Sequence, residues 1–404
     1  MTRILVYSHD TFGLGNIRRM VRIAEELVAR HGDASVLVVT GSPMLHAFRL
    51  PPRIDYVKLP CLARDSDGVY GVKHLDMAFA DAVRMRASLT LSAASDFNPD
   101  IVLVDKKPLG VAGELAPTLE LLSHRATPPA IHLLQRDILD TPEATCAIWE
   151  AQGYHDAIER YYDSVIVVGD PDIFDMAKAY AFPPSTAAKL SYAGYLNRAP
   201  RDHAPNLSRT MGTAPMVLVH AGGGEDGASL LDATLDAVRM AGPTRGFACR
   251  IVGGPELAPA EQMRLRARAM ALPDVTWLNF TDAMGDEVAA ADLVISMGGY
   301  NSVCEVLSYR KRSIIVPRST PVREQRIRAE AMARLGLLSM IAIEDLRPGA
   351  LLDRIRIELE RTNVVHSRMA RLNFNGLDGI CERLLGTDRS DPAWIEPRSV
   401  DNRL

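Results

Sequence analysis

Short apolar runs alternate with longer segments of helical spacing along most of the chain. The run Ile4–Tyr7 has the length of one buried strand, and the segment after it places apolar side chains at about every third or fourth position between Ile17 and Val28. The same alternation predicts strands at residues 36–40, 100–105, 130–134, 164–168 and 190–193, and a helix at 74–97. Strands that alternate with helices in this way predict a doubly wound parallel sheet.

The pattern breaks over residues 197–215. This stretch is polar and contains Pro200, Pro205 and Pro215, which is typical of a domain boundary. Strands are then predicted at residues 216–220, 250–252, 275–280, 293–296, 313–317 and 339–342, and helices at 348–362 and about 371–385. We therefore expect domains over 1–196 and 216–370, a linker over 197–215 and a loosely ordered tail over 386–404.

Composition places the chain among ordinary globular proteins. Its 404 residues are 47% hydrophobic and 24% charged, and the formal net charge of -4 gives no general reason to expect a nucleic-acid partner. The five cysteines lack the spacing of a zinc site, which favours reduced thiols and a cytoplasmic location. No apolar run approaches the roughly 20 residues of a membrane span, and no signal peptide is recognised. Peripheral contact with a membrane surface stays an open alternative.

Glycine turns follow two of the strands predicted in the second half. Gly222–Gly224 come after the strand at 216–220, and Gly298 and Gly299 come after the strand at 293–296. Open α/β sheets bind ligands at the carboxyl ends of their strands. Backbone amides and the helix dipole favour a phosphate where a helix begins at such a turn. These turns therefore predict a phosphate-binding edge.

The segment 292–336 continues with Glu305 on a helix and with the pair Glu324–Gln325 after the next strand. This spacing resembles the donor half of the family 28 glycosyltransferases, which include the muramoyl-pentapeptide N-acetylglucosaminyltransferases. It resembles still more closely a group of bacterial proteins known only as predicted glycosyltransferases. The resemblance implies the GT-B architecture, in which two doubly wound Rossmann-like domains face a central cleft. The same resemblance implies that the C-terminal helix at about 371–385 packs back on the N-terminal domain. It also implies an inverting transfer, without a metal or cofactor, from a nucleotide diphosphate sugar to a sugar, lipid-linked or small-molecule acceptor.

The resemblance further implies individual donor contacts in the C-terminal domain. Glu305 would hold the ribose hydroxyls, Glu324 and Gln325 would face the sugar, and a uridine diphosphate would be the preferred nucleotide. The expected contacts are Gly222, Gly223, Gly224, Gly253, Phe280, Thr281, Met297, Gly298, Gly299, Asn301, Ser302, Glu305, Arg318, Glu324 and Gln325. The spacing Ser302-x-x-Glu305 also fits a helix capping box, which would give Glu305 a structural role only.

The loop after the first strand resembles the Gly-x-Gly-(His)-x-x-Arg pattern with which related transferases begin. Gly13, Gly15 and Arg19 fit that pattern, whereas Asn16 stands where the family usually has His. An amide has no useful basicity, so Asn16 would mark lost activity, position the acceptor or cap the helix. We expect the general base elsewhere on this loop, with Asp10 ahead of His9, because a carboxylate in a closing cleft can have a raised pKa. A structural histidine is an equal alternative for His9.

The same edge of the N-terminal domain is expected to contact the acceptor. Expected acceptor-side residues are Gly13, Gly15, Lys106, Arg136 and Asp137. For Arg136 and Asp137, a role as an ordinary strand-end cap is an equal alternative. Two acidic pairs, at residues 65–67 and 170–172, are interpreted as polar turns, the first because no apolar strand precedes it.

Two other functions fit the same fold. One is a nucleotide-sugar hydrolase or 2-epimerase, and the other is a binding protein without activity, which Asn16 makes credible.

Overall fold

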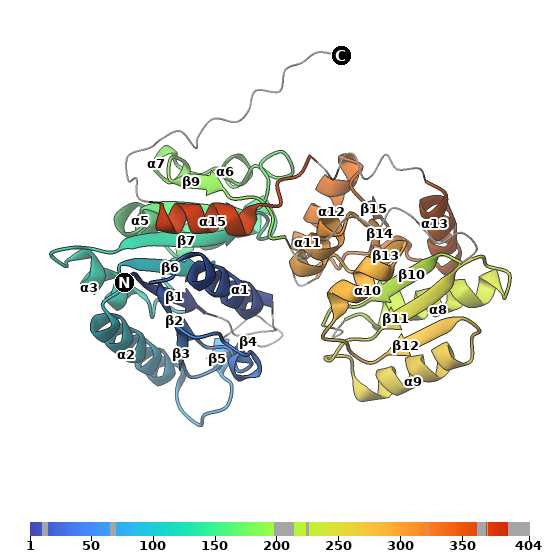
Figure 1. Cartoon of the computed structure of the whole chain (residues 1–404), viewed down its shortest axis with the longest axis horizontal. Coiled ribbons are helices and arrows are strands. Elements are labelled where there is room, and N and C mark those ends of the chain that lie inside the picture. The colour runs from blue at the N-terminus through green and yellow to red at the C-terminus, as the bar shows by residue number, and fades with distance from the viewer. Residues whose placement is uncertain are drawn as a thin grey trace, which may run out of the picture.

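The chain forms two α/β lobes (Figure 1). The structure is a computed structural model that describes residues 1–9, 15–64, 70–197, 214–223, 226–320, 322–361, 369 and 371–386. Each lobe contains one parallel sheet with helices on both faces, as the alternating pattern predicted.

The N-terminal lobe contains a seven-stranded sheet of order β3-β2-β1-β6-β7-β8-β9. Its strands are β1 Arg3–Ser8, β2 Ser35–Thr40, β3 Ile54–Lys58, β6 Ile101–Asp105, β7 Ala130–Arg136, β8 Ser164–Val168 and β9 Leu190–Tyr192. Its helices are α1 Gly15–Arg30, α2 Phe79–Phe97, α3 Ala116–Ser123, α4 Pro142–Ala151, α5 Tyr154–Tyr161, α6 Met176–Ala179 and α7 Pro184–Ala187. The central strands β6 and β8 are buried along their whole length, which explains their continuous apolar runs.

The C-terminal lobe contains a six-stranded sheet of order β12-β11-β10-β13-β14-β15. Its strands are β10 Met216–His220, β11 Ala248–Val252, β12 Val275–Leu278, β13 Leu293–Ser296, β14 Arg312–Ile315 and β15 Ser339–Met340. Its helices are α8 Ala228–Ala241, α9 Pro259–Met270, α10 Met284–Ala290, α11 Tyr300–Ser308, α12 Glu324–Arg334 and α13 Pro348–Glu360. In each sheet the strand order changes direction between two neighbouring strands, which are β1 and β6 in the first lobe and β10 and β13 in the second.

The sequence pattern missed three strands of the first lobe. The edge strand β3 has only one buried residue, so it carries no apolar run. An antiparallel hairpin of β4 Leu62–Arg64 and β5 Tyr70–Val72 flanks the first acidic pair. The expectation that no strand precedes this pair was therefore wrong, although residues 65–69 lie outside the described part of the chain. Helix α2 also begins at Phe79, five residues later than predicted.

The last described helix returns to the first lobe. Helix α15, Gly376–Leu385, packs against α1, and Arg30 forms an ion pair with Asp378 (Figure 1). It begins later than the predicted residue 371, because Asn375 pairs as a β-bridge with Leu196. The family resemblance implied that this C-terminal segment packs on the N-terminal domain, and the structure has that contact.

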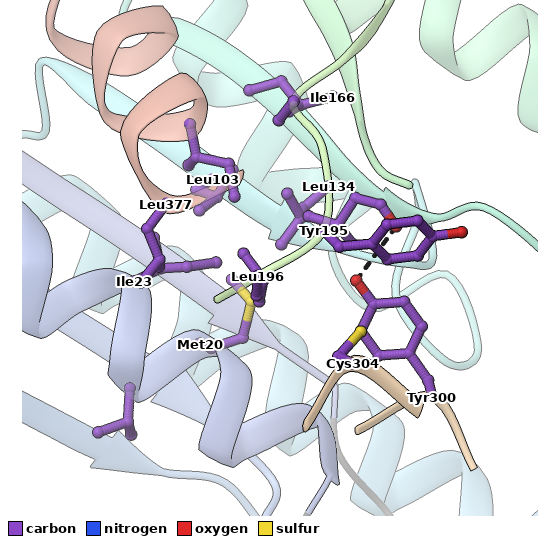
Figure 2. Packing of buried hydrophobic residues seen from close by; sticks show 14 of the residues in the cluster. Met20, Ile23, Leu103, Leu134, Ile166, Tyr195, Leu196, Tyr300, Cys304 and Leu377 are labelled. Atoms are coloured by element: carbon purple, nitrogen blue, oxygen red, sulfur yellow. Dashed lines mark hydrogen bonds between the residues drawn. The ribbon is translucent and has the colours of Figure 1, made fainter. Parts of the chain in front are cut away.

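Apolar packing joins the two lobes. Tyr300 and Cys304 of α11 belong to the same buried cluster as Met20 of α1 and Leu134 of β7 (Figure 2). The rings of Tyr300 and Tyr195 have centroids 6.3 Å apart, and the Tyr300 hydroxyl donates to the Val168 carbonyl at 3.1 Å. Helix α11 is therefore held by both lobes at once.

Two further features bear on the expected location. None of the helices in the described ranges is long and apolar enough to cross a membrane. All five cysteines lie in the described part of the chain, and no disulfide joins them. The cytoplasmic location stays a prediction.

Candidate functional site

The two predicted glycine turns meet at the point where the C-terminal sheet changes direction. Strands β10 and β13 are neighbours, and His220 at the end of β10 pairs in register with Ser296 at the end of β13. The turns that follow these residues are Ala221–Gly223 and Met297–Gly299. Ligands of open α/β sheets bind at such a switch point, outside the carboxyl ends of the strands.

Backbone geometry explains why glycine stands in these turns. Gly222 and Gly298 have φ of +67° and +76°, a left-handed conformation that other residues rarely adopt. A Cβ added at Gly222 or Gly299 would meet no atom within 4 Å, so the backbone there is uncovered. At Gly253, by contrast, a Cβ would lie 2.9 Å from the Trp277 ring, so packing suffices to explain this glycine. Its predicted role as a donor contact stays a prediction.

Helix α11 begins directly at the second turn. Its N-cap is Gly299, so Asn301 and Ser302 lie in the first turn, and Glu305 lies further inside the helix. The capping-box alternative is therefore wrong, because Ser302 is the third helical residue and not the cap. Glu305 is partly exposed on the α11 helix, which is compatible with a ligand contact.

The loop after β14 brings a cation to the same edge. Arg318 forms an ion pair of 3.1 Å with Asp226, which follows the first glycine turn. The Arg318 amide donates to Gln325 Oε1 at 3.3 Å. Glu324 and Gln325 are the first two residues of α12, and both are 8% exposed. The structure thus brings Arg318, Glu324 and Gln325 together beside the glycine turns.

Glu324 points toward the other lobe. Its carboxylate receives two contacts from Arg136, of 3.2 and 2.9 Å. Burial raises the pKa of Glu324, but the cations Arg136, Arg328, Lys106 and Arg318 together bring this pKa below its ordinary value. Glu324 is therefore ionised at neutral pH.

Lys106 has two features of a functional position. Its φ is +64°, a strained conformation for a residue with a side chain. Burial lowers the pKa of Lys106 to about 8, the charge of Arg136 acts in the same direction, and that of Glu324 opposes it. Lys106 thus adds a cation to the boundary between the lobes.

Asp137 lies in an interior network. It is fully buried, it accepts a hydrogen bond of 2.7 Å from the Tyr195 hydroxyl, and its Oδ1 lies 3.6 Å from Arg328. Asp137 is therefore held in the interior of the fold, while Arg136 contacts Glu324 of the other lobe. Their predicted contacts with an acceptor stay predictions.

The start of α1 forms a second cluster, at the switch point between β1 and β6 of the N-terminal sheet. Arg19 forms a buried ion pair of 2.5 Å with Asp105 at the end of β6, and Arg19 also donates to Asn16 Oδ1 at 3.4 Å. Asn16 is the second residue of α1, so the interpretation as an N-cap is wrong. Nδ1 of the nearby His9 lies 3.2 Å from the carbonyl oxygen of Asp105, and burial lowers the pKa of His9 to about 4.

Several predicted residues receive no structural test. Asp10, Gly13 and Gly224 lie outside the described residues, and of Gly15 only the backbone is described. Among the other expected donor contacts, Phe280 is 52% exposed and Thr281 accepts a hydrogen bond from the Ala283 amide. Met297 is 7% exposed and lies in the core. Within the described ranges, no group of three or more acidic, histidine or cysteine side chains is arranged to hold a metal ion.

Sequence reasoning missed the residues that connect the lobes. Tyr300 and Tyr195 look like ordinary core residues in the sequence, and their hydroxyl bonds could not be foreseen. Arg328 is fully buried although arginine is normally exposed. A signal existed for Arg328, because it lies four residues after Glu324 and hence on the same face of α12.

Residues 204–383 match the model of the glycosyltransferase family 28 C-terminal domain. The second half of this chain is therefore similar to the C-terminal domain of the family 28 glycosyltransferases. A curated relative from Syntrophotalea carbinolica, a UDP-N-acetylglucosamine--N-acetylmuramyl-(pentapeptide) pyrophosphoryl-undecaprenol N-acetylglucosamine transferase, is 28% identical over 183 residues. That match covers 44% of this chain and 50% of the relative, so only about half of the relative's length is matched.

Solved structures confirm the architecture around this matched region. MurG of Acinetobacter baumannii superposes with a TM-score of 0.62 at 15% identity, covering 95% of this chain and 99% of that one. A structure described as a UDP-N-acetylglucosamine 2-epimerase from Listeria monocytogenes gives a TM-score of 0.60 at 14% identity, covering 96% and 98%. These likenesses show the fold, which is GT-B as predicted. The matched residues 204–383 contain both glycine turns, Glu305 and the Glu324–Gln325 pair.

Proposed function

We propose that the protein is a glycosyltransferase that moves a sugar from a nucleotide diphosphate sugar to a sugar, lipid-linked or small-molecule acceptor. The observation that carries this proposal is the position of Glu305 on α11. It lies inside a helix whose N-terminal amides meet two glycine turns at a switch point, in a region similar to the family 28 domain. The curated relative is named as an N-acetylglucosamine transferase with a UDP-N-acetylglucosamine donor, which supports a UDP sugar here as well.

The chemistry follows from the groups at this edge. The amides of the glycine turns and the start of α11 offer donors to a diphosphate, and Arg318 adds a positive charge. Charge on the leaving nucleotide would then be stabilised by fixed protein groups and without a metal ion. An acceptor hydroxyl that approaches from the N-terminal lobe attacks the sugar on the face opposite the leaving nucleotide. Attack from that face inverts the anomeric centre.

Glu305→Ala tests the nucleotide site. If Glu305 holds the ribose, affinity for the nucleotide sugar should fall by about 1.5 to 3 kcal/mol, because a charged group loses hydrogen bonds to hydroxyls. A Glu305 with only a structural role would instead lower the melting temperature and leave the affinity unchanged. Calorimetry with uridine, thymidine, guanosine and adenosine diphosphates measures both the loss and the base preference. Glu330→Ala, an exposed glutamate on α12, is the control.

Unchanged affinity in Glu305→Ala would remove the ribose role, and tighter binding of a purine nucleotide would remove the preference for uridine. The fate of the sugar separates this function from its alternatives. Transfer to an acceptor supports the proposal, whereas release to water or inversion at C2 would indicate the hydrolase or epimerase. Binding without turnover would indicate a protein that has lost activity.

For the general base we propose Asp10, with His9 as the second candidate. An inverting transfer requires a group that accepts the proton of the acceptor hydroxyl. Burial lowers the pKa of His9 to about 4, so its imidazole has lost the basicity that would place it ahead of the neighbouring carboxylate. We expect Asp10→Asn to lose turnover and His9→Gln to retain most of it, with nucleotide affinity intact in both. A faster Asn16→His variant beside an unaffected Asp10→Asn variant would contradict this choice.

A further inference from the structure

The start of α12 is attached to the N-terminal lobe by a series of contacts. Arg136 at the end of β7 holds Glu324, and the Arg323 amide donates to Asp140 Oδ1 at 3.0 Å. Arg328, one turn further along α12, lies 3.6 Å from Asp137. The segment 136–140 therefore meets one face of α12 over more than one helical turn.

The Arg136–Glu324 pair determines the orientation of the Glu324 carboxylate as well as its ionisation. Arg136 Nη1 donates a hydrogen bond to Glu324 Oε1 at 3.2 Å, and Nη2 lies 2.9 Å from Oε2 as an ion contact without hydrogen-bond geometry. Oε2 is therefore buried without a hydrogen-bond partner in the described structure, while the planar guanidinium fixes the carboxylate through both contacts. The two side chains are only 13% and 10% exposed, so salt screens the pair weakly. Arg136 thus sets the orientation of Glu324 as well as its ionisation.

We propose that Arg136 is a positioning residue for Glu324, through which the N-terminal lobe takes part in recognising the donor sugar. The inference rests on the proposed function, in which Glu324 faces that sugar. A carboxylate recognises a sugar by accepting hydrogen bonds from its hydroxyls, and these bonds require oxygens in fixed positions. Because one carboxylate serves both the sugar and the lobe contact, sugar binding and the contact between lobes are coupled.

The test separates the sugar from the nucleotide. We define the sugar increment as the Kd of the nucleoside diphosphate divided by the Kd of the nucleotide sugar. In Arg136→Gln the increment should fall about tenfold, while the nucleoside diphosphate alone binds as in the parent. Arg136→Lys should restore part of it, because an ammonium makes a point contact and not a fork. Arg326→Gln is the matched control, since Arg326 lies on the same helix and pairs with Glu330 and Glu344 at the surface.

A pH profile distinguishes positioning from a purely structural role. Arg136 is the cation with the largest effect on the Glu324 pKa, so its removal should raise that pKa. The sugar increment should decrease at low pH as Glu324 becomes protonated. The pH of this decrease should be higher in Arg136→Gln than in the parent and unchanged in Arg326→Gln. An Arg136 that only fastens the lobes would lower the melting temperature without moving the pH of this decrease, which would overturn the proposal.

A second measurement requires no donor. The amide hydrogen exchange of residues 322–328 should become faster in Arg136→Gln and in Glu324→Gln. In the double variant the exchange should be no faster than in either single variant, within experimental error. Additive increases would overturn the pairing itself. Nucleotide binding with an unchanged sugar increment in Arg136→Gln would overturn the positioning role alone. A parent protein that binds no nucleotide sugar would overturn the proposed function, and the sugar-recognition role with it.

Discussion

Gly298 and Gly299 follow the same strand, but different constraints act on them. Gly298 has φ of +76°, and a Cβ there would lie 2.5 Å from Ile315 Cγ2. Gly299 has φ of -56°, and a Cβ there would meet no atom within 4 Å. The first glycine is required by the fold, whereas only a ligand at the α11 terminus would require the second.

Alanine at each position tests this difference. Gly298→Ala should destabilise the protein by about 1 to 3 kcal/mol, because it combines a strained φ with a steric clash. Gly299→Ala should cost less than about 1 kcal/mol, the range of an N-cap change. It should nevertheless weaken nucleotide binding if a phosphate approaches this backbone. Thermal melts and calorimetry on both variants measure the two effects. Equal stability loss would contradict the steric assignment, and unchanged affinity in Gly299→Ala would contradict a phosphate here.

At the scale of elements, α12 uses charge where most buried helices use apolar packing. Arg328 is fully buried, its guanidinium lies 5.4 Å from the Tyr300 ring centroid, and its nearest carboxylate is that of Asp137. None of its guanidinium nitrogens has a hydrogen-bond partner among the described residues. The docking of α12 on the N-terminal lobe therefore depends on an ionic contact that is shielded from water.

Removing one member of the Arg328–Asp137 pair should destabilise the protein. Asp137→Asn removes the nearest counter-charge of the buried Arg328, so it should destabilise the protein by about 3 kcal/mol. Adding Arg328→Met to this variant should recover part of the loss, because the buried charge is then gone. Urea unfolding of the single and double variants measures this. Asp232→Asn, in a partly exposed arginine network, should cost about 1 kcal/mol or less. A double variant less stable than Asp137→Asn would contradict this account.

At the scale of the whole molecule, three buried histidines should make the fold sensitive to acid. Burial lowers the pKa of His9, His132 and His220 to about 4 in each case, from an ordinary value of 6.5. Each is therefore neutral in the folded protein at neutral pH. The unfolded chain binds their protons at a higher pH than the folded chain does.

Stability should be fully present above pH 6.5 and decrease as the pH falls from 6.5 toward 4. Each of the three histidines contributes a slope of roughly 1.4 kcal/mol per pH unit within this window. His220→Met should reduce the total slope by about one histidine, since neither ring nitrogen of His220 has a partner in the described structure. Urea unfolding at pH 7.5, 6.0 and 5.0 measures the slope. Equal slopes in the parent and in His220→Met would contradict a neutral buried His220.

The order of strands and helices, the two lobes and the similarity of the second half to a family 28 domain could be predicted from the sequence. Buried parallel strands need continuous apolar runs, and phosphate-binding turns need glycine beside a helix start, so both leave local patterns. The edge strand β3 and the hairpin β4–β5 left weaker patterns, because few of their side chains are buried.

Only the tertiary structure decided what individual charged residues do. In the sequence, Glu305 was compatible with a cap, and Arg136 with an acceptor contact or a cap. The start of α11 at Gly299 excluded the capping box for Glu305, and the packing of the lobes placed Arg136 on Glu324, 188 residues away in the chain. The physical reason is range: hydrophobic periodicity acts between neighbours in the chain, whereas the partner of a buried charge is whichever group the packed fold brings within a few ångströms.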